Sequence, residues 1–135
     1  MAKRILIVDD TEDLLELFRL VLEEEGYQVE LRSVPFEQAQ EIEQIGPDLI
    51  ILDLLFREEG SGWRMLDLLK QEPATAFIPV IVCTAARHYV QEHEDALVAR
   101  SVRVIHKPFE VDALLALITE AVGASATAQE GADQA

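Results

Sequence analysis

The chain has 135 residues, half of them apolar, and its 26 acidic and 11 basic side chains give a formal net charge of −15. That length and apolar fraction suit one compact domain with a real core. The acidic excess argues against nucleic acid and against an anionic membrane surface as partners, because both attract clustered lysine and arginine. With no signal peptide before the first apolar run and no stretch of roughly 20 apolar residues, we expect a cytoplasmic location.

Short apolar runs alternate with longer stretches of helical periodicity. The runs predict strands over 5–8, 27–31, 49–52, 79–83 and 102–105. The first, third and fourth runs are almost wholly apolar, as parallel strands buried on both faces should be. The second run alternates and should be an edge strand with one wet face. The single cysteine, Cys83, lies in the fourth run and is interpreted as a small core residue that cannot form an internal disulfide.

Apolar stripes between the runs predict helices. They cover 14–22, 36–45, 65–69, 89–98 and 111–122, and the fourth is the weakest and the richest in charge. Strand and helix alternate five times, and parallel strands are joined by right-handed crossovers. We therefore predict an α/β fold with a five-stranded parallel sheet in the order 2-1-3-4-5, doubly wound and flavodoxin-like, with helices on both faces.

The composition changes at Gly123, after which no large apolar residue remains. Such a segment can bury nothing, so we expect residues 1–122 to form the domain and residues 123–135 to be a flexible tail or a linker stub. No effector domain is visible, and a single-domain protein that acts by docking is expected.

Polar residues follow four of the predicted strands at their carboxyl ends. Asp9 and Asp10 follow the first strand, Asp53 the third, Thr84 the fourth and Lys107 the fifth. In an open α/β sheet, ligands bind outside the carboxyl ends of the strands at the topological switch point. In the order 2-1-3-4-5 this point lies between the first and third strands, so the three aspartates should face one another.

This set of residue types suits phosphoryl transfer. Three carboxylates in one cleft repel one another, and a hard cation such as Mg²⁺ would offset that repulsion. The transfer itself needs a nucleophile, a metal and donors around the moving oxygens. Asp53 is the candidate nucleophile, Lys107 the cation and Thr84 the hydroxyl donor.

Each of these residues also has a purely structural explanation. Asp9 and Asp10 can cap the next helix and complement its dipole, and Asp53 can be a turn residue. Thr84 can make a local hydrogen bond, and Lys107 can be a solvated side chain before a proline. Their coincidence at four strand ends favours a functional site.

The ordered set of motifs over residues 3–122 resembles the receiver family of two-component response regulators. The matching pieces are Ile7-Val8-Asp9-Asp10, Ile51-Leu52-Asp53-Leu54, Gly62, Val82-Cys83-Thr84-Ala85-Ala86 and His106-Lys107-Pro108-Phe109. The resemblance implies that Asp53 accepts a phosphoryl group from a sensor histidine kinase or a histidine phosphotransfer protein. It implies Mg²⁺ bound by Asp10, Asp53 and the backbone carbonyl of Leu55, with Asp9 acting through a metal-bound water.

The resemblance further implies that Lys107 and Thr84 hold phosphoryl oxygens and that the Lys107–Pro108 bond is cis. Such a domain catalyses only its own phosphorylation and dephosphorylation, and signals to a downstream protein whose identity stays open. Whether phosphorylation produces a homodimer stays open too. The sequence names neither the cognate kinase nor the pathway.

The sequence departs from the family pattern at several positions. Val104 stands three residues before Lys107, where the family usually has Tyr or Phe, so the readout should be weaker or different. Arg57 replaces the usual proline in a loop that is one residue longer. Leu55 and Ala86 are apolar and cannot orient a hydrolytic water, so we expect a long-lived phosphoryl group.

Three alternatives differ in class. A haloacid-dehalogenase-type phosphatase would need an Asp-x-Asp pattern on the first strand, and Asp9-Asp10-Thr11 lacks it. A flavodoxin-like FMN binder would want a Gly- and hydroxyl-rich loop there, since acids repel phosphate. The third alternative is a receiver-fold scaffold in which Val104 and the altered loop uncouple phosphorylation from output.

Overall fold

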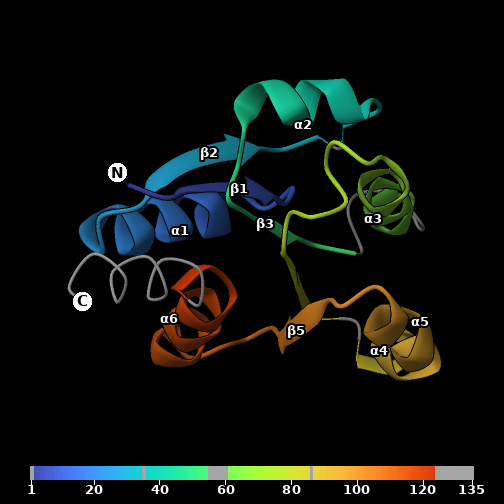
Figure 1. Ribbon diagram of the computed structural model, residues 1–135. Helices are drawn as coiled ribbons and strands as arrows, with labels where there is room; N and C mark the ends of the chain where they lie inside the picture. The colour runs from blue at the N-terminus through green and yellow to red at the C-terminus, as the bar shows by residue number, and fades with distance from the viewer. Residues whose placement is uncertain (1, 35, 55–60, 86, 124–135) are drawn as a thin grey trace, which may run out of the picture.

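The computed structural model describes residues 2–34, 36–54, 61–85 and 87–123, in which strands and helices alternate (Figure 1). The elements are β1 (Arg4–Val8), α1 (Glu12–Glu24), β2 (Gln28–Arg32), α2 (Ala39–Ile45), β3 (Leu49–Leu52), α3 (Ser61–Gln71), β4 (Val80–Thr84), α4 (Arg87–Glu92), α5 (Glu94–Ala99), β5 (Arg103–His106), α6 (Val111–Ile118) and the π-helical turn η1 (Thr119–Gly123). Within these ranges no helix is long and apolar enough to span a membrane.

The five strands form one parallel sheet in the order β2-β1-β3-β4-β5, which confirms the predicted fold class and topology. Each strand lies within one residue of its predicted range. β3 and β4 are buried along their whole length, as expected of central parallel strands. β2 lies at the edge as predicted, but its accessibility does not alternate: Gln28 is exposed and the next four residues are half-buried.

The helix predicted over 89–98 is wrong as a single element, because the chain forms two short helices, α4 and α5, that meet at His93. The backbone of His93 has φ −114° and ψ 17°. Its N–H bonds to the carbonyl of Val90, three residues back, at 3.2 Å, and its own carbonyl accepts the bond from Leu97 that begins α5. The tight turn ends one helix and starts the next.

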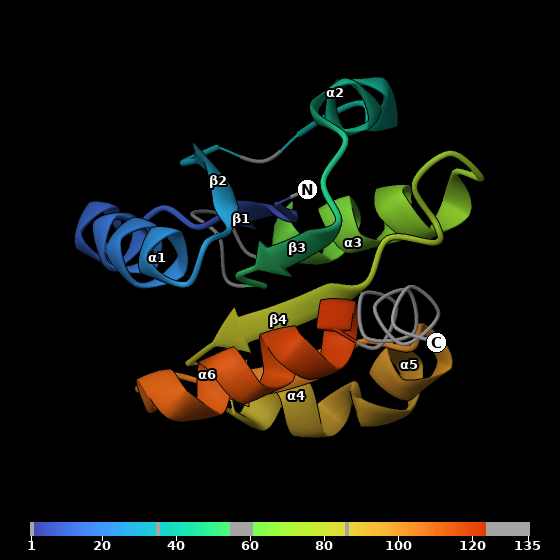
Figure 2. The same ribbon diagram turned by 60° about the vertical axis from the view of Figure 1, so that its left-hand side comes forward.

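Two apolar layers pack on the sheet. α1 and α6 cover one face, and α2, α3, α4 and α5 cover the other; Figure 2 shows α6 in front of β4 and α3 behind β3. Side chains alternate between the layers, as the strand period requires: Ile50 and Leu52 point to the α3 side, Leu49 and Ile51 to the α1 side. Burying a side chain of this kind contributes roughly 2 kcal/mol.

Just beyond the strands, backbone hydrogen bonds join the carboxyl end of β3 to β1 and that of β5 to β4. Asp53 N–H bonds to the Val8 carbonyl at 3.1 Å, and Lys107 N–H bonds to the Thr84 carbonyl at 2.9 Å. These bonds continue the parallel ladder past the last strand residues. They fix the backbone from which the polar side chains at this edge project.

Candidate functional site

The candidate site lies at the carboxyl edge of the sheet, where strand ends place acids beside a lysine. Asp9 follows β1, Asp53 follows β3 and Lys107 follows β5. The Asp9 and Asp53 residues are 2% and 7% exposed, so both carboxylates are largely removed from water. Buried carboxylates persist as ions only with charged or hydrogen-bonding partners.

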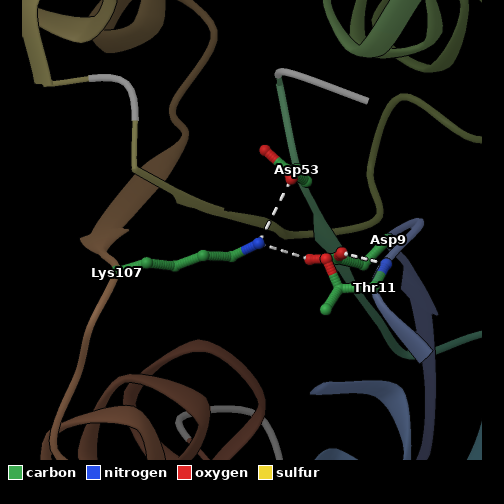
Figure 3. A network of polar contacts seen from close by, with 4 residues as sticks. All are labelled: Asp9, Thr11, Asp53 and Lys107. Carbon is green, nitrogen blue, oxygen red and sulfur yellow. Dashed lines mark hydrogen bonds and ion pairs between the residues drawn. The ribbon is translucent and has the colours of Figure 1, made fainter. Parts of the chain in front are cut away.

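Lys107 supplies such a partner to both acids (Figure 3). Its Nζ lies 2.7 Å from Asp9 Oδ2 and 3.1 Å from Asp53 Oδ2. The other oxygen of Asp9 accepts a hydrogen bond from the backbone N–H of Thr11 at 2.9 Å, which fixes the orientation of that carboxylate. One ammonium group therefore bridges the ends of β1 and β3 from β5.

The surroundings of Lys107 favour its charged form. Burial lowers the pKa of this lysine, but the hydrogen bond to Asp9 and the charges of Asp53 and Asp9 outweigh burial, and the net result is a raised pKa. The ammonium group therefore stays protonated at neutral pH. It is a fixed positive charge aimed at the place where Asp53 would react.

Asp10 completes a group of three carboxylates. One oxygen from each of Asp9, Asp10 and Asp53 can be chosen so that the three lie within 4.8 Å of one another. Carboxylate oxygens are hard ligands, and a small set of them with room for water is what Mg²⁺ prefers. The residues present fit a divalent cation, because three acids around one lysine leave a site that a positive ion would stabilise.

Thr84 ends β4 at this edge and is fully buried. The Lys107–Pro108 peptide bond is cis, as the resemblance implied. Thr84 ends β4 and Lys107 follows the adjoining strand β5, and the backbone N–H of Lys107 donates a hydrogen bond to the Thr84 carbonyl. Leu55, Arg57 and Ala86 fall outside the described residues, so the carbonyl ligand and the long-lived phosphoryl group stay predictions.

The structure explains why position 62 is a glycine, which the sequence alone could not. A Cβ at this position would lie 2.4 Å from the Asp53 carbonyl oxygen and 2.6 Å from the Leu54 Cα. Only glycine lets the first turn of α3 approach the backbone of the candidate nucleophile this closely. The start of α3 is therefore docked on the site.

The sequence interpretation quoted His106 only within a matching motif and gave the residue no role of its own. Its Nδ1 is buried and has no hydrogen-bond partner among the described residues. The position directly before Lys107 carried no signal, because a lone histidine at a strand end is compatible with many environments. Its burial only becomes visible once β4 and β5 are paired.

The comparisons with known proteins agree with this fold. Residues 5–119 match the family described as the response regulator receiver domain. The chain is 35% identical over 119 residues to the phosphate regulon transcriptional regulatory protein PhoB of Klebsiella pneumoniae, which covers 87% of this chain and 51% of that protein. This chain spans about half the length of the curated PhoB relatives it matches.

Solved structures give the same result. A CheY-like response regulator receiver domain protein from Methanospirillum hungatei matches with a TM-score of 0.78 and 27% identity, over 94% of this chain and 98% of that one. The receiver domain of a Pseudomonas aeruginosa sensor histidine kinase was solved with magnesium coordinated in its active site cleft. It matches with a TM-score of 0.76 over 91% of this chain and 99% of that one. At 19% identity, that second likeness shows the fold alone.

The fold and the acid–lysine cluster define a doubly wound, CheY-like α/β domain with acidic residues at the carboxyl edge of its sheet. With the family match over most of the chain, the protein belongs to the response regulator receiver domain family of two-component systems.

Proposed function

We propose that this domain accepts a phosphoryl group on Asp53 from a phosphohistidine donor in the presence of Mg²⁺. The observation that carries the proposal is the convergence of Asp9, Asp10 and Asp53 within 4.8 Å, with Lys107 bonded to two of them. An acid cluster of this kind destabilises the fold unless cations offset it, since like charges in a low-dielectric site repel.

In the proposed reaction an Asp53 carboxylate oxygen forms the new O–P bond as the N–P bond of the donor breaks. The electron pair of the broken bond returns to the donor imidazole, which leaves as a neutral ring after taking up a proton. The carboxylate is a sufficient nucleophile because phosphoryl transfer depends mainly on position and electrostatics. The burial of Asp53 keeps the reacting oxygen away from bulk water.

The residues around Asp53 supply that electrostatic stabilisation. Lys107 already lies 3.1 Å from Asp53 Oδ2 and is charged, so it can follow the negative charge onto a phosphoryl oxygen. Thr84 supplies a hydroxyl from the adjoining strand. We assign Asp10, Asp53 and the Leu55 carbonyl as direct Mg²⁺ ligands and Asp9 as a ligand through water. When bound, the ion neutralises charge on the phosphoryl oxygens.

The partners follow from this chemistry. The donor is a phosphohistidine on a sensor histidine kinase or a phosphotransfer protein, which places the chain in the cytoplasm beside ATP-dependent kinases. The output is docking of a downstream protein, biased by the added charge. The curated relatives are named as transcriptional regulators; what this chain controls is a separate matter, since it spans about half their length.

A second candidate function rests on Val104. This half-buried residue of β5 packs against the α3-side core and stands where the family usually has an aromatic ring. A smaller side chain there favours a domain that is phosphorylated but does not convert the modification into a change of surface. In that case the chain is a scaffold with constant affinity for its partner.

The test is phosphorylation by acetyl phosphate with and without Mg²⁺, followed by intact mass. We expect a gain of one phosphoryl group that requires Mg²⁺ and is absent from Asp53→Asn. The matched control is Asp95→Asn, an exposed acid of α5 that should leave the gain unchanged. Modification that persists in Asp53→Asn would refute the assignment, and equal partner affinity before and after modification would favour the scaffold.

A further inference from the structure

The last residue of β5, His106, is paired in register with Thr84 on β4. Strands β4 and β5 are parallel, and their register pairs Val82 with Val104 and Thr84 with His106. Val82 and Val104 belong to the core on the α3 side, whereas Cys83 and Ile105 belong to the core on the α1 side. Because side chains alternate along a strand, Thr84 and His106 share the α3-side face as direct cross-strand neighbours.

The surroundings of His106 leave one of its polar atoms unsatisfied. Nδ1 is buried and finds no partner within the described part of the chain. Buried polar atoms are nearly always hydrogen-bonded, because a buried atom without a partner has lost its hydrogen bonds to water and gained none in return. An unpartnered nitrogen on the edge of a reactive site is therefore a candidate for a bond that forms in another state of the protein.

The face that carries His106 has Val104 at the position where the family pattern usually has an aromatic ring. Val104 is two residues earlier on the same face of β5, and its short side chain cannot reach past Thr84 as a Tyr or Phe would. His106 is the ring-bearing residue of β5 and is one strand step closer to Lys107. The histidine is thus placed to act on the Thr84 hydroxyl itself.

We propose that His106 is a positioning residue that orients the Thr84 hydroxyl toward the phosphoryl group on Asp53. A threonine hydroxyl has one hydrogen to donate and lone pairs that accept. If His106 Nδ1–H donates to Thr84 Oγ1, the single hydroxyl hydrogen is left to point at a phosphoryl oxygen. The inference rests on the proposed phosphorylation of Asp53 and adds a second residue to its threonine donor.

The test compares two substitutions at His106 by their rates of Mg²⁺-dependent phosphorylation with acetyl phosphate. His106→Leu fills similar space without a donor, whereas the amide nitrogen of His106→Asn takes the place of Nδ1. We expect the rate to fall roughly fivefold in His106→Leu, as for the loss of one hydrogen bond, and to recover to within about twofold in His106→Asn. No recovery in His106→Asn would overturn the proposal.

A double-mutant cycle with Thr84→Val shows whether His106 acts through the hydroxyl. The expected outcome is that His106→Leu has no further effect once the hydroxyl is gone. An equal fall in both backgrounds would mean that His106 acts directly on the phosphoryl group or only supports the fold, and would overturn the proposal. If the wild type is never phosphorylated, the proposed function fails instead, and the two failures are distinguishable.

A spectroscopic readout does not depend on the rate. The chain has three histidines, so the His106 imidazole can be assigned in ¹⁵N spectra by its loss in His106→Asn. Phosphorylation should make the Nδ1–H proton slow to exchange, and Thr84→Val should abolish this protection. An Nδ1 resonance that is the same with and without the phosphoryl group would contradict the proposal. This readout from the wild type holds even if Thr84→Val is phosphorylated too slowly for its rate to be measured.

Discussion

Two ion-paired clusters, one at the strand ends and one between α5 and α3, have the same short contact in very different surroundings. At the strand ends, Lys107 Nζ lies 2.7 Å from Asp9 Oδ2, and between α5 and α3, Arg100 Nη2 lies 2.7 Å from Asp67 Oδ1. The Asp9 side chain is 3% exposed, whereas those of Arg100 and Asp67 are 30% and 29% exposed.

The two clusters differ in the number of carboxylates that surround each cation. Lys107 faces a group of acids that repel one another, an arrangement that costs stability and therefore points to chemistry. Arg100 meets a single carboxylate and also lies over the ring of Trp63, with its Cζ 4.9 Å from the ring centroid. That second cluster joins two helices, and pairs of this exposure contribute modestly. Distance alone does not separate a pair in a candidate site from a structural pair.

The largest effect that tests this contrast is on the rate of phosphorylation. In Lys107→Met we expect the Mg²⁺-dependent rate with acetyl phosphate to fall by about 100-fold, because a charge aimed at the transferring oxygens is lost. The affinity for Mg²⁺ should rise at the same time, since the acids lose their counter-ion. In Arg100→Met, which breaks an equally short pair, the rate should stay within about twofold of wild type. Equal losses in both variants would erase the distinction.

The docking of α3 on Asp53 links the two clusters and gives the next effect. In Gly62→Ala the new methyl group must displace backbone, and we expect a loss of roughly 2–3 kcal/mol in the free energy of unfolding by urea. Gly26→Ala is the control: Gly26 has φ +90° but nothing within 4 Å of its Cβ position, so only backbone strain of about 1 kcal/mol is added. A larger loss at Gly26 would show that the close approach of α3 is not the constraint.

The two regions differ in how much of their structure could be predicted from the sequence. The sheet order and the meeting of Asp9, Asp10 and Asp53 were predictable, because buried parallel strands are almost continuously apolar and their carboxyl ends share one edge. The division of the fourth helix at His93 was not predictable, since it depends on one backbone hydrogen bond from His93 to Val90. The pairing of Arg100 with Asp67, 33 positions apart, joins two polar helix faces for which periodicity gives no register.

The helix-joining cluster gives a smaller effect that a single probe can follow. In Arg100→Lys the positive charge stays, but the paired contacts of the guanidinium with Asp67 and its stacking on Trp63 are lost. We expect the free energy of unfolding to fall by about 1 kcal/mol. Trp63 is the only tryptophan in the chain, so its fluorescence should change as well. An unchanged emission spectrum would mean that the guanidinium does not control the surroundings of this ring.

The smallest effect concerns Cys83, which lies one residue before Thr84 on the opposite face of β4. Burial raises the pKa of its thiol from 9.0 to about 12; Lys107 lowers it, and Asp9 and Asp53 raise it further. Between these two values the unfolded chain releases the thiol proton and the folded chain keeps it. Stability should therefore be unaffected below the lower value and fall as pH rises above it.

The comparison with Cys83→Ala isolates this contribution, because other groups also titrate at high pH. Between about pH 8 and about pH 10, the free energy of unfolding of the wild type should fall relative to that of Cys83→Ala. A thiol reagent should leave the native protein unmodified at about pH 8 and react fully in urea. Rapid reaction of the native thiol would mean that the charges of the site, rather than burial, dominate at Cys83, and that the reactive cluster extends one residue deeper into the core.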